Sequence, residues 1–215
     1  YEGEGNQVGE AFSVKISILN KILDGFTLEV EDPAKKGADK ASISIYGKKS
    51  DGNYEKIRNA YTSDLGFARI KNLSTDYDEY LLLINGSFAR GEGEKNNYSI
   101  YRRVIKSEQL GTKIFISSDE TVKVDFSMRD ENGNELINPQ VIIAPSYNIN
   151  NEVKTLELLS PWKIGANSEI YLDKGINDIY GYWSPDIGEG SFGNTYYLTD
   201  TVEISSDSKQ INLDL

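Results

Sequence analysis

The sequence predicts an all-β protein made of two tandem antiparallel β-sandwich domains, residues 1–117 and 118–215. Three observations predict this fold. Apolar and polar residues alternate with a period of two, turn sequences separate the alternating segments, and a set of motifs recurs after about 100 residues. The best helical candidate, residues 151–160, is short and rich in β-branched and turn residues, so we expect no amphipathic helix.

The alternation defines the strands with one buried and one solvated face. It is clearest in residues 12–18, 41–45, 122–126 and 211–215. Two uninterrupted apolar runs, 81–84 and 141–143, are instead typical of central strands that are buried on both faces. Turn chemistry between these segments, including Asn85-Gly86 and residues 130–134, predicts the reversals of the chain.

An internal repeat predicts the division into two domains. The tripeptide Gly91-Glu92-Gly93 and the strand that follows it recur at Gly188-Glu189-Gly190, with offsets of 97 and 98 residues. Upstream, Val14-Lys15-Ile16 matches Val122-Lys123-Val124 at an offset of 108, which implies about ten extra residues in the first half. Two diverged copies of one β unit explain the pattern, and their size fits an immunoglobulin-like sandwich with a boundary near residues 117–119.

Both halves resemble one known family. The first half contains Thr62-Ser63-Asp64-Leu65-Gly66, a short apolar strand and Tyr80-Leu81-Leu82-Leu83-Ile84. The second contains Leu172-Asp173-Lys174-Gly175, without the proline that is usual before this glycine. This pattern is similar to the prealbumin-like repeats, also called carboxypeptidase-regulatory-like domains. The resemblance implies an Ig-like β-sandwich, and non-catalytic tandem modules of bacterial secreted or cell-surface proteins, including large extracellular proteases.

Composition narrows the chemistry that is available. The chain has no histidine and no cysteine, which excludes His-based and Cys-based nucleophilic machinery, thiolate or imidazole zinc sites, and disulfides. We therefore expect no enzyme and no cofactor. The net charge of −11 disfavours nucleic-acid binding and docking on anionic lipid, and no apolar run is long enough for membrane insertion.

The charge is unevenly distributed. Residues 1–117 carry 17 basic and 17 acidic side chains, whereas residues 118–215 carry 6 basic and 17 acidic ones, so the whole excess lies in the second half. Basic pairs such as Arg102-Arg103 are too short to be binding tracts, and we interpret them as solvated faces of strands or turns.

The first candidate site is an aromatic platform in the second half. Strand alternation places Tyr180 and Tyr182 on one face with Asp178, and Trp183 on the other face with Ile179. The same rule turns Tyr197 outward from the strand that contains Leu198 and Val202. Exposed rings beside carboxylates suit sugar stacking, so the candidate ligand-binding residues are Tyr180, Tyr182, Trp183 and Tyr197. The alternative is that these tyrosines serve only as strand formers.

Two further candidates are weaker. Asp130, Asn132 and Asn134 offer oxygen ligands at alternate positions, which suits adventitious Ca²⁺, but the spacing departs from an EF-hand loop and also fits a plain Asn-Gly turn. A Lys–Asn isopeptide cross-link of the kind found in related pilin and adhesin domains would need inward-facing Lys15 or Lys123 and Asn212. Alternation places all three on the solvated face, which argues against this bond.

These observations predict a non-catalytic pair of modules that acts as a spacer, stabiliser or adhesion unit at the bacterial cell surface or outside the cell, including as an accessory to an extracellular protease. The expected partners are neighbouring domains of a larger surface protein, with glycans and host or cell-wall proteins as further candidates. The alternative function is a carbohydrate-binding module that uses the aromatic platform.

Overall fold

The computed structural model describes residues 25–71, 73, 76–159, 162–163, 170–188, 191–205 and 210–214. Within these ranges the regular elements are strands and two single-turn 3-10 helices, η1 (Ser107–Gln109) and η2 (Ser118–Glu120), so the predicted all-β fold is confirmed. The strand expected at residues 12–18 lies outside the described residues. No helix in the described ranges is long and apolar enough to span a membrane.

The strands before residue 117 form two facing sheets. They are β1 (Gly25–Glu31), β2 (Ser42–Lys48), β3 (Tyr54–Tyr61), β4 (Phe67–Lys71), β5 (Glu79–Ala89), β6 (Asn96–Lys106) and β7 (Lys113–Phe115). One sheet has the order β4-β1-β7, and the other begins β3-β2-β5-β6. We call this part of the chain the first repeat.

The strands after residue 117 form the second repeat. They are β8 (Thr121–Arg129), β9 (Gln140–Ile149), β10 (Glu152–Thr155), β11 (Trp162–Lys163), β12 (Ile170–Asp173), β13 (Gly175–Trp183), β14 (Asp186–Gly188), β15 (Ser191–Phe192), β16 (Tyr196–Ile204) and β17 (Gln210–Asp214). Strands β12, β8 and β17 lie side by side, and β10-β9-β13-β16 form the facing sheet, with β11 beside β9. The segment considered for a helix, residues 151–160, contains strand β10.

The strand pairing repeats from one half to the other. The order β4-β1-β7 recurs as β12-β8-β17, and β3-β2-β5-β6 recurs as β10-β9-β13-β16. The registers also recur, since Ile45 lies opposite Leu82 in the β2–β5 pair and Ile143 lies opposite Ile179 in the β9–β13 pair. The sequence repeat therefore corresponds to a repeat of topology and register.

Two parts of the predicted repeat alignment are wrong. The strand after the Gly-Glu-Gly tripeptide repeats at an offset of 97 residues and not 98, because Ile100 opposite Asn85 corresponds to Tyr197 opposite Tyr182. The counterpart of β8 is β1, because Glu29 of β1 lies opposite Lys113 of β7 just as Asp125 of β8 lies opposite Gln210 of β17. The match of residues 14–16 to 122–124, with its ten extra residues, followed an alternation that many strands share. Strand pairing, which is not visible in short motifs, sets the true offset.

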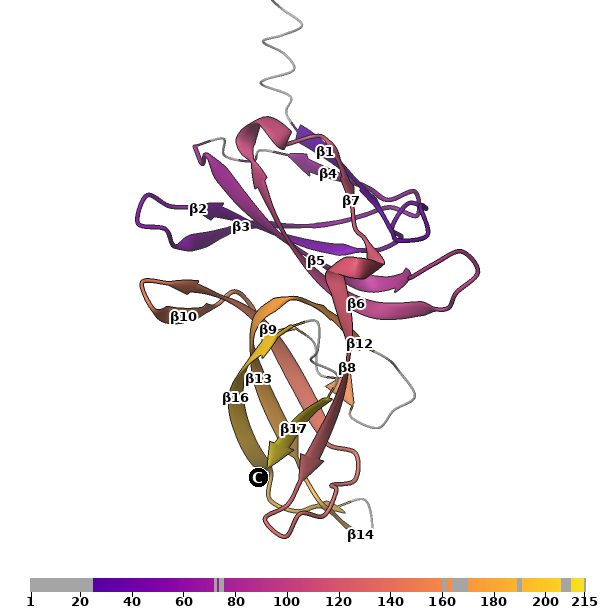
Figure 1. Cartoon of the computed structure of the whole chain (residues 1–215), viewed down its shortest axis with the longest axis vertical. Helices are drawn as coiled ribbons and strands as arrows, with labels where there is room; N and C mark the ends of the chain where they lie inside the picture. The colour runs from indigo at the N-terminus through magenta and orange to yellow at the C-terminus, as the bar shows by residue number, and fades with distance from the viewer. Residues whose placement is uncertain are drawn as a thin grey trace, which may run out of the picture.

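A single sheet crosses from one repeat to the other (Figure 1). Strand β6 pairs in parallel with β12, with Ile100 opposite Leu172, and this pairing joins the strands into the order β17-β8-β12-β6-β5-β2-β3. Parallel pairing also occurs between β1 and β7 and between β8 and β17, although the sequence indicated only antiparallel neighbours. The shared sheet makes the two repeats one continuous structure.

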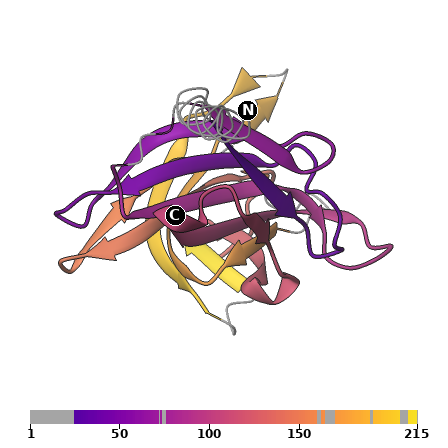
Figure 2. The same ribbon diagram turned by 90° about the horizontal axis from the view of Figure 1, so that it is seen from above.

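Two hydrophobic cores lie on opposite faces of this shared sheet. Leu82 and Ile84 of β5 belong to the core beneath β4-β1-β7, whereas Leu81 and Leu83 belong to the core shared with β9, β12 and β13. The run 81–84 is therefore buried on both faces, as its uninterrupted apolar sequence predicted. Seen from above in Figure 2, the strands of the first repeat lie over those of the second.

The predicted turn at Asn85-Gly86 is wrong. Strand β5 continues through both residues, with Asn85 opposite Ile100 and Gly86 opposite Ser99 of β6. A Cβ on Gly86 would lie 3.0 Å from the Phe88 ring, so the glycine provides room for a buried aromatic side chain and does not form a reversal.

Candidate functional site

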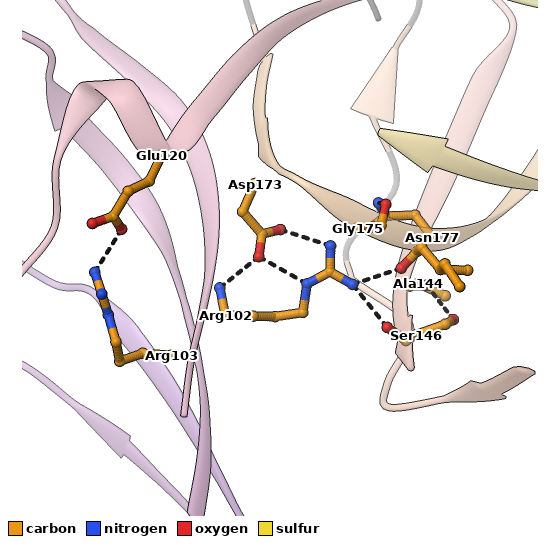
Figure 3. Close-up of polar contacts among 9 residues, drawn as sticks. Arg102, Arg103, Glu120, Ala144, Ser146, Asp173, Gly175 and Asn177 are labelled. Atoms are coloured by element: carbon orange, nitrogen blue, oxygen red, sulfur yellow. Dashed lines mark hydrogen bonds and ion pairs between the residues drawn. The ribbon is translucent and has the colours of Figure 1, made fainter. Parts of the chain in front are cut away.

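Arg102 of β6 connects the two repeats through a nearly buried ion pair (Figure 3). Its backbone N–H and Nε donate to Oδ2 of Asp173 at 2.9 and 2.8 Å, and Nη2 donates to Oδ1 at 2.9 Å. Nη1 donates to the carbonyl oxygens of Ser146 and Ile176 at 2.8 and 2.6 Å. The two side chains are only 11% and 9% exposed, so this bidentate pair acts in a largely dehydrated setting.

The local backbone prepares the place for the Arg102 guanidinium. Gly175 has φ +139°, and a Cβ there would lie 2.8 Å from Nη2 of Arg102. Burial raises the pKa of Asp173 while Arg102 opposes that shift, so Arg102 favours the ionised carboxylate. The prediction that Arg102 lies on a solvated face is therefore wrong, because the second repeat covers this face of β6.

A second contact region between the repeats lies on the same face of the shared sheet, toward its β3 edge. The rings of Tyr54 and Tyr147 meet edge to face with centroids 5.0 Å apart, and the Tyr54 N–H donates to the Tyr147 hydroxyl at 3.1 Å. Glu157 accepts a hydrogen bond from the Ser44 hydroxyl at 2.7 Å and forms an ion pair with Lys56. The contacts between the repeats therefore extend from β6 to β3.

Buried tyrosines make this interface sensitive to alkaline pH. Burial, with a smaller effect of Glu157, raises the pKa of Tyr98 to about 12, and the same two causes raise the pKa of Tyr46. A raised pKa means that the folded state keeps the phenolic proton. The resulting stability is therefore complete below the unfolded pKa of about 10 and is lost as pH rises toward 12.

We expect Tyr98→Phe to make the loss of stability between pH 10 and pH 12 less steep, because the variant has no phenol to ionise at this position. The variant should also lose about 1 kcal/mol at neutral pH, since the Tyr98 hydroxyl donates to Oδ1 of Asn85 at 3.0 Å. Urea unfolding across this pH range measures both effects. Tyr61→Phe, at an exposed tyrosine, serves as the control. Equal alkaline slopes for the wild type and Tyr98→Phe would contradict the assignment.

The candidate aromatic residues divide between the two faces of the β13–β16 pair. Tyr182 lies directly opposite Tyr197, and Tyr180 lies two residues along β13 on the same outer face. Trp183 points to the other face, where its ring lies 5.7 Å from that of Tyr196 and its Nε1 donates to the Ile137 carbonyl at 3.0 Å. The predicted faces are confirmed. We call Tyr180, Tyr182 and Tyr197 the tyrosine face.

Asp178 also lies on the outer face of β13 and connects three neighbouring strands. It accepts hydrogen bonds from the hydroxyls of Ser146, Thr155 and Thr201 at 2.8, 2.6 and 2.7 Å. Burial alone would raise its pKa, but these three donors hold the pKa below its usual value. Asp178 therefore acts as a structural acceptor in the sheet.

A groove of about 860 Å³ lies at the end of the second repeat. Tyr182 and Trp183 contribute to its lining, whereas Tyr180 and Tyr197 do not. Phe192, which the sequence-based site did not include, lines the same groove and is 70% exposed. Three carboxylate residues share this lining: Asp130, Glu135 and Asp186. The groove thus combines aromatic and acidic side chains, although two of the four predicted residues lie elsewhere.

The predicted calcium ligands form a turn. Oδ1 of Asp130 accepts hydrogen bonds from the backbone N–H groups of Asn132 and Asn134 at 2.9 and 2.8 Å. Its Oδ2 accepts a hydrogen bond from Nδ2 of Asn134 at 3.0 Å. These bonds lower the pKa of Asp130, with the Asn134 side chain as the largest cause. They account for the residue pattern as an Asx-type turn, and calcium binding stays a prediction. The described part of the chain contains no group of three or more acidic side chains placed to hold a metal ion.

Two of the three isopeptide candidates lie where the alternation placed them. Lys123 on β8 and Asn212 on β17 are exposed, and Oδ1 of Asn212 accepts the Ser127 hydroxyl at 2.7 Å. Lys15 lies outside the described residues.

No family model matches the chain, and no curated protein sequence matches it either. Among solved structures, the shaft pilin SpaA from Lactobacillus rhamnosus GG is 11% identical, with 89% of this chain and 97% of that chain covered and a TM-score of 0.29. BcpA, the major pilin subunit of Bacillus cereus, is 12% identical over 90% and 69% of the two chains, with a TM-score of 0.30. A streptococcal ancillary pilin is 12% identical over 91% and 63%, with a TM-score of 0.29. TM-scores of this size do not establish the fold by themselves. The fold assignment follows instead from the strand pairing within this chain.

Proposed function

We propose that this chain is a non-catalytic extracellular module of a bacterial secreted or cell-surface protein, in which two repeats form a rigid spacer that stabilises or presents a neighbouring domain. The observation that carries the proposal is the sheet shared by the two repeats, fastened by Arg102 and Asp173. A spacer must transmit position and force from one end to the other, and a shared sheet does so without a hinge.

A hinge motion that separates the two repeats would be unfavourable in free energy, which supports a rigid spacer. Separating the repeats would expose four apolar side chains of the first repeat, Tyr46, Leu81, Leu83 and Ile100, each at most 4% exposed in the structure. It would also break the β6–β12 pairing and leave the Asp173 carboxylate without its cation. Each of these changes is unfavourable, so the repeats should move as one body.

Features of the sequence support the proposed location and the non-enzymatic role. The resemblance to prealbumin-like modules supports a location at the bacterial surface or outside the cell, including a role as an accessory of an extracellular protease. The absence of histidine and cysteine supports a non-enzymatic role, since it removes the commonest catalytic side chains. Neighbouring domains of a larger surface protein are the expected partners.

Cooperative unfolding tests the rigid-spacer proposal. Both tryptophans of the chain lie after residue 117, so tryptophan fluorescence reports on the second repeat, whereas far-UV circular dichroism reports on both repeats. We expect the two signals to give the same urea midpoint, because the shared sheet couples the repeats. A fluorescence midpoint well apart from the circular dichroism midpoint would show two independent modules and would contradict the proposal.

The groove beside Trp183 supports a second candidate function, carbohydrate binding. Its exposed Phe192 ring can stack on the C–H face of a sugar, and its carboxylates can accept hydroxyl hydrogen bonds. If this function is correct, a glycan array should show saturable binding that Phe192→Ala removes without lowering the melting temperature. Tyr61→Ala, at another exposed ring, should bind normally. The absence of any saturable binding by the wild type would contradict this candidate.

A further inference from the structure

We propose that the free edge of β16, together with Tyr197 of the tyrosine face, binds the β4 edge of a second copy of this chain, so that copies associate head to tail. The proposal adds a partner to the spacer role and rests on that role. The proposed contact repeats the parallel β6–β12 pairing that joins the two repeats, with β16 in the place of β6 and β4 in the place of β12.

The first of the two edges belongs to β16. It is the counterpart of β6, because Tyr197 lies opposite Tyr182 in the second repeat as Ile100 lies opposite Asn85 in the first. The outer edge of β6 pairs with β12. In the described part of the chain, β16 pairs as a strand with β13 only, so no strand lies beside its outer edge. The edge at residues 196–198 is a template for pairing with another chain, whereas farther along β16 the Thr201 N–H donates to the Asp200 carboxylate at 2.8 Å.

The second edge belongs to β4, the counterpart of β12. Leu28 lies opposite Ala68 in the β1–β4 pair as Val124 lies opposite Ile170 in the β8–β12 pair. In the described ranges β4 pairs with β1 only, whereas β12 also pairs with β6 through residues 170–172. The edge that β12 uses to join the repeats is therefore left open on β4.

Side-chain and loop contacts define which part of the β4 edge is available. The Phe67 carbonyl accepts the Ser63 N–H at 2.8 Å, and the Lys71 carbonyl accepts a hydrogen bond from the Arg58 guanidinium. Between these two carbonyls lie residues 68–70. They are the counterparts of residues 170–172, the three residues through which β12 pairs with β6.

The equivalence also fixes the register of the new contact. Since Ile170 lies opposite Tyr98, Ala68 of one copy should lie opposite Thr195 of the next, and Ile70 opposite Tyr197. Parallel pairing in this register brings the starts of the two strands together.

Exposed apolar side chains cluster at both of these strand starts. Leu65 and Phe67, at the start of β4, are 67% and 43% exposed, and Tyr196 and Tyr197, at the start of β16, are 49% and 76% exposed. Tyr197 occupies the position of Ile100, which is only 1% exposed because the second repeat covers it. In this register Phe67 and Tyr196 share one face of the joined sheet and Tyr197 lies on the other, so exposed apolar side chains become available for burial on both faces.

Charge complementarity favours the same orientation. Exposed Arg69 and Lys71 lie on β4, whereas the second half of the chain carries the whole excess of negative charge, including Asp200 on β16. Because the two edges are different surfaces at separate places on the chain, the contact is heterologous and can continue from copy to copy.

Complementary edge variants test the proposal by sedimentation velocity, from micromolar to millimolar concentration. Tyr197→Asp blocks the β16 edge, Phe67→Asp blocks the β4 edge, and Val153→Asp places the same charge at an exposed site on β10 as the matched control. We expect the wild type and Val153→Asp to reach at least twice the monomer mass at high concentration, and to dissociate in high salt. Each edge variant alone should remain monomeric.

The decisive sample is an equimolar mixture of the two edge variants. Each partner retains one intact edge, so the mixture should form heterodimers and nothing larger. A wild type that stays monomeric throughout would overturn the proposal, as would a mixture that stays monomeric while the wild type associates. Either result leaves the coincidence of the unfolding midpoints unaffected, so failure of this proposal is distinguishable from failure of the spacer role.

Discussion

Replacing Arg102 by leucine should lower the free energy of unfolding by about 3–5 kcal/mol. The substitution leaves the Asp173 carboxylate, 9% exposed, without the guanidinium that donates to both of its oxygens. It also removes the donors to the carbonyls of Ser146 and Ile176. Urea unfolding monitored by circular dichroism measures the loss.

Two further variants separate the ion pair from a general effect of losing an arginine. Arg103→Leu removes the neighbouring arginine, whose partner Glu120 is 36% exposed, and should cost less than about 1 kcal/mol. The double variant Arg102→Leu, Asp173→Leu should recover part of the loss, since no buried charge is then left unpaired. Equal effects of the Arg102 and Arg103 substitutions would contradict the assignment of the Arg102–Asp173 ion pair as the contact that fastens the two repeats.

Replacing Leu83 by alanine should lower the free energy of unfolding by about 2–5 kcal/mol. Leu83 belongs to a strand of the first repeat, but its side chain is fully buried in the core shared with the second repeat. The cavity should therefore shift the unfolding midpoint seen by tryptophan fluorescence as much as the midpoint seen by circular dichroism. A fluorescence midpoint that stays at the wild-type value would show that the second repeat does not depend on this side chain.

The matched control is Leu65→Ala. Leu65 is 67% exposed, in the turn before β4, so its truncation creates no cavity and should change stability by no more than about 0.5 kcal/mol. A comparable loss at Leu65 would mean that the effect at Leu83 is not due to burial between the repeats.

The sequence allowed the faces of individual strands to be predicted. The period of two placed Tyr180 and Tyr182 on the face opposite to that of Trp183, and it turned Tyr197 outward. The run 81–84 indicated a strand buried on both faces, and the structure shows why, since a separate core lies on each side of it. These predictions succeeded because they depend only on which neighbouring side chains are apolar.

The contacts between strands could not be predicted in this way. Nothing local marks Arg102 as buried, because its burial depends on β12 pairing with β6 some 70 residues later in the chain. Asn85-Gly86 has the composition of a turn, but Phe88 and the long β5–β6 pairing keep it extended. Phe192 lines the groove because the β14–β15 hairpin places it at the same groove as Trp183, and the alternation pattern alone did not show this. For Arg102 and for Asn85-Gly86, a long-range contact overrides a local signal.

A distance measurement between the two repeats shows whether they form one rigid body. The chain has no cysteine, so Glu108→Cys and Glu131→Cys, at exposed positions in the first and second repeat, would carry the only two spin labels. Double electron–electron resonance should give a single distance distribution no broader than label rotamers allow, and Arg102→Leu should broaden it. A broad or bimodal distribution in the wild-type background would contradict a rigid shared sheet.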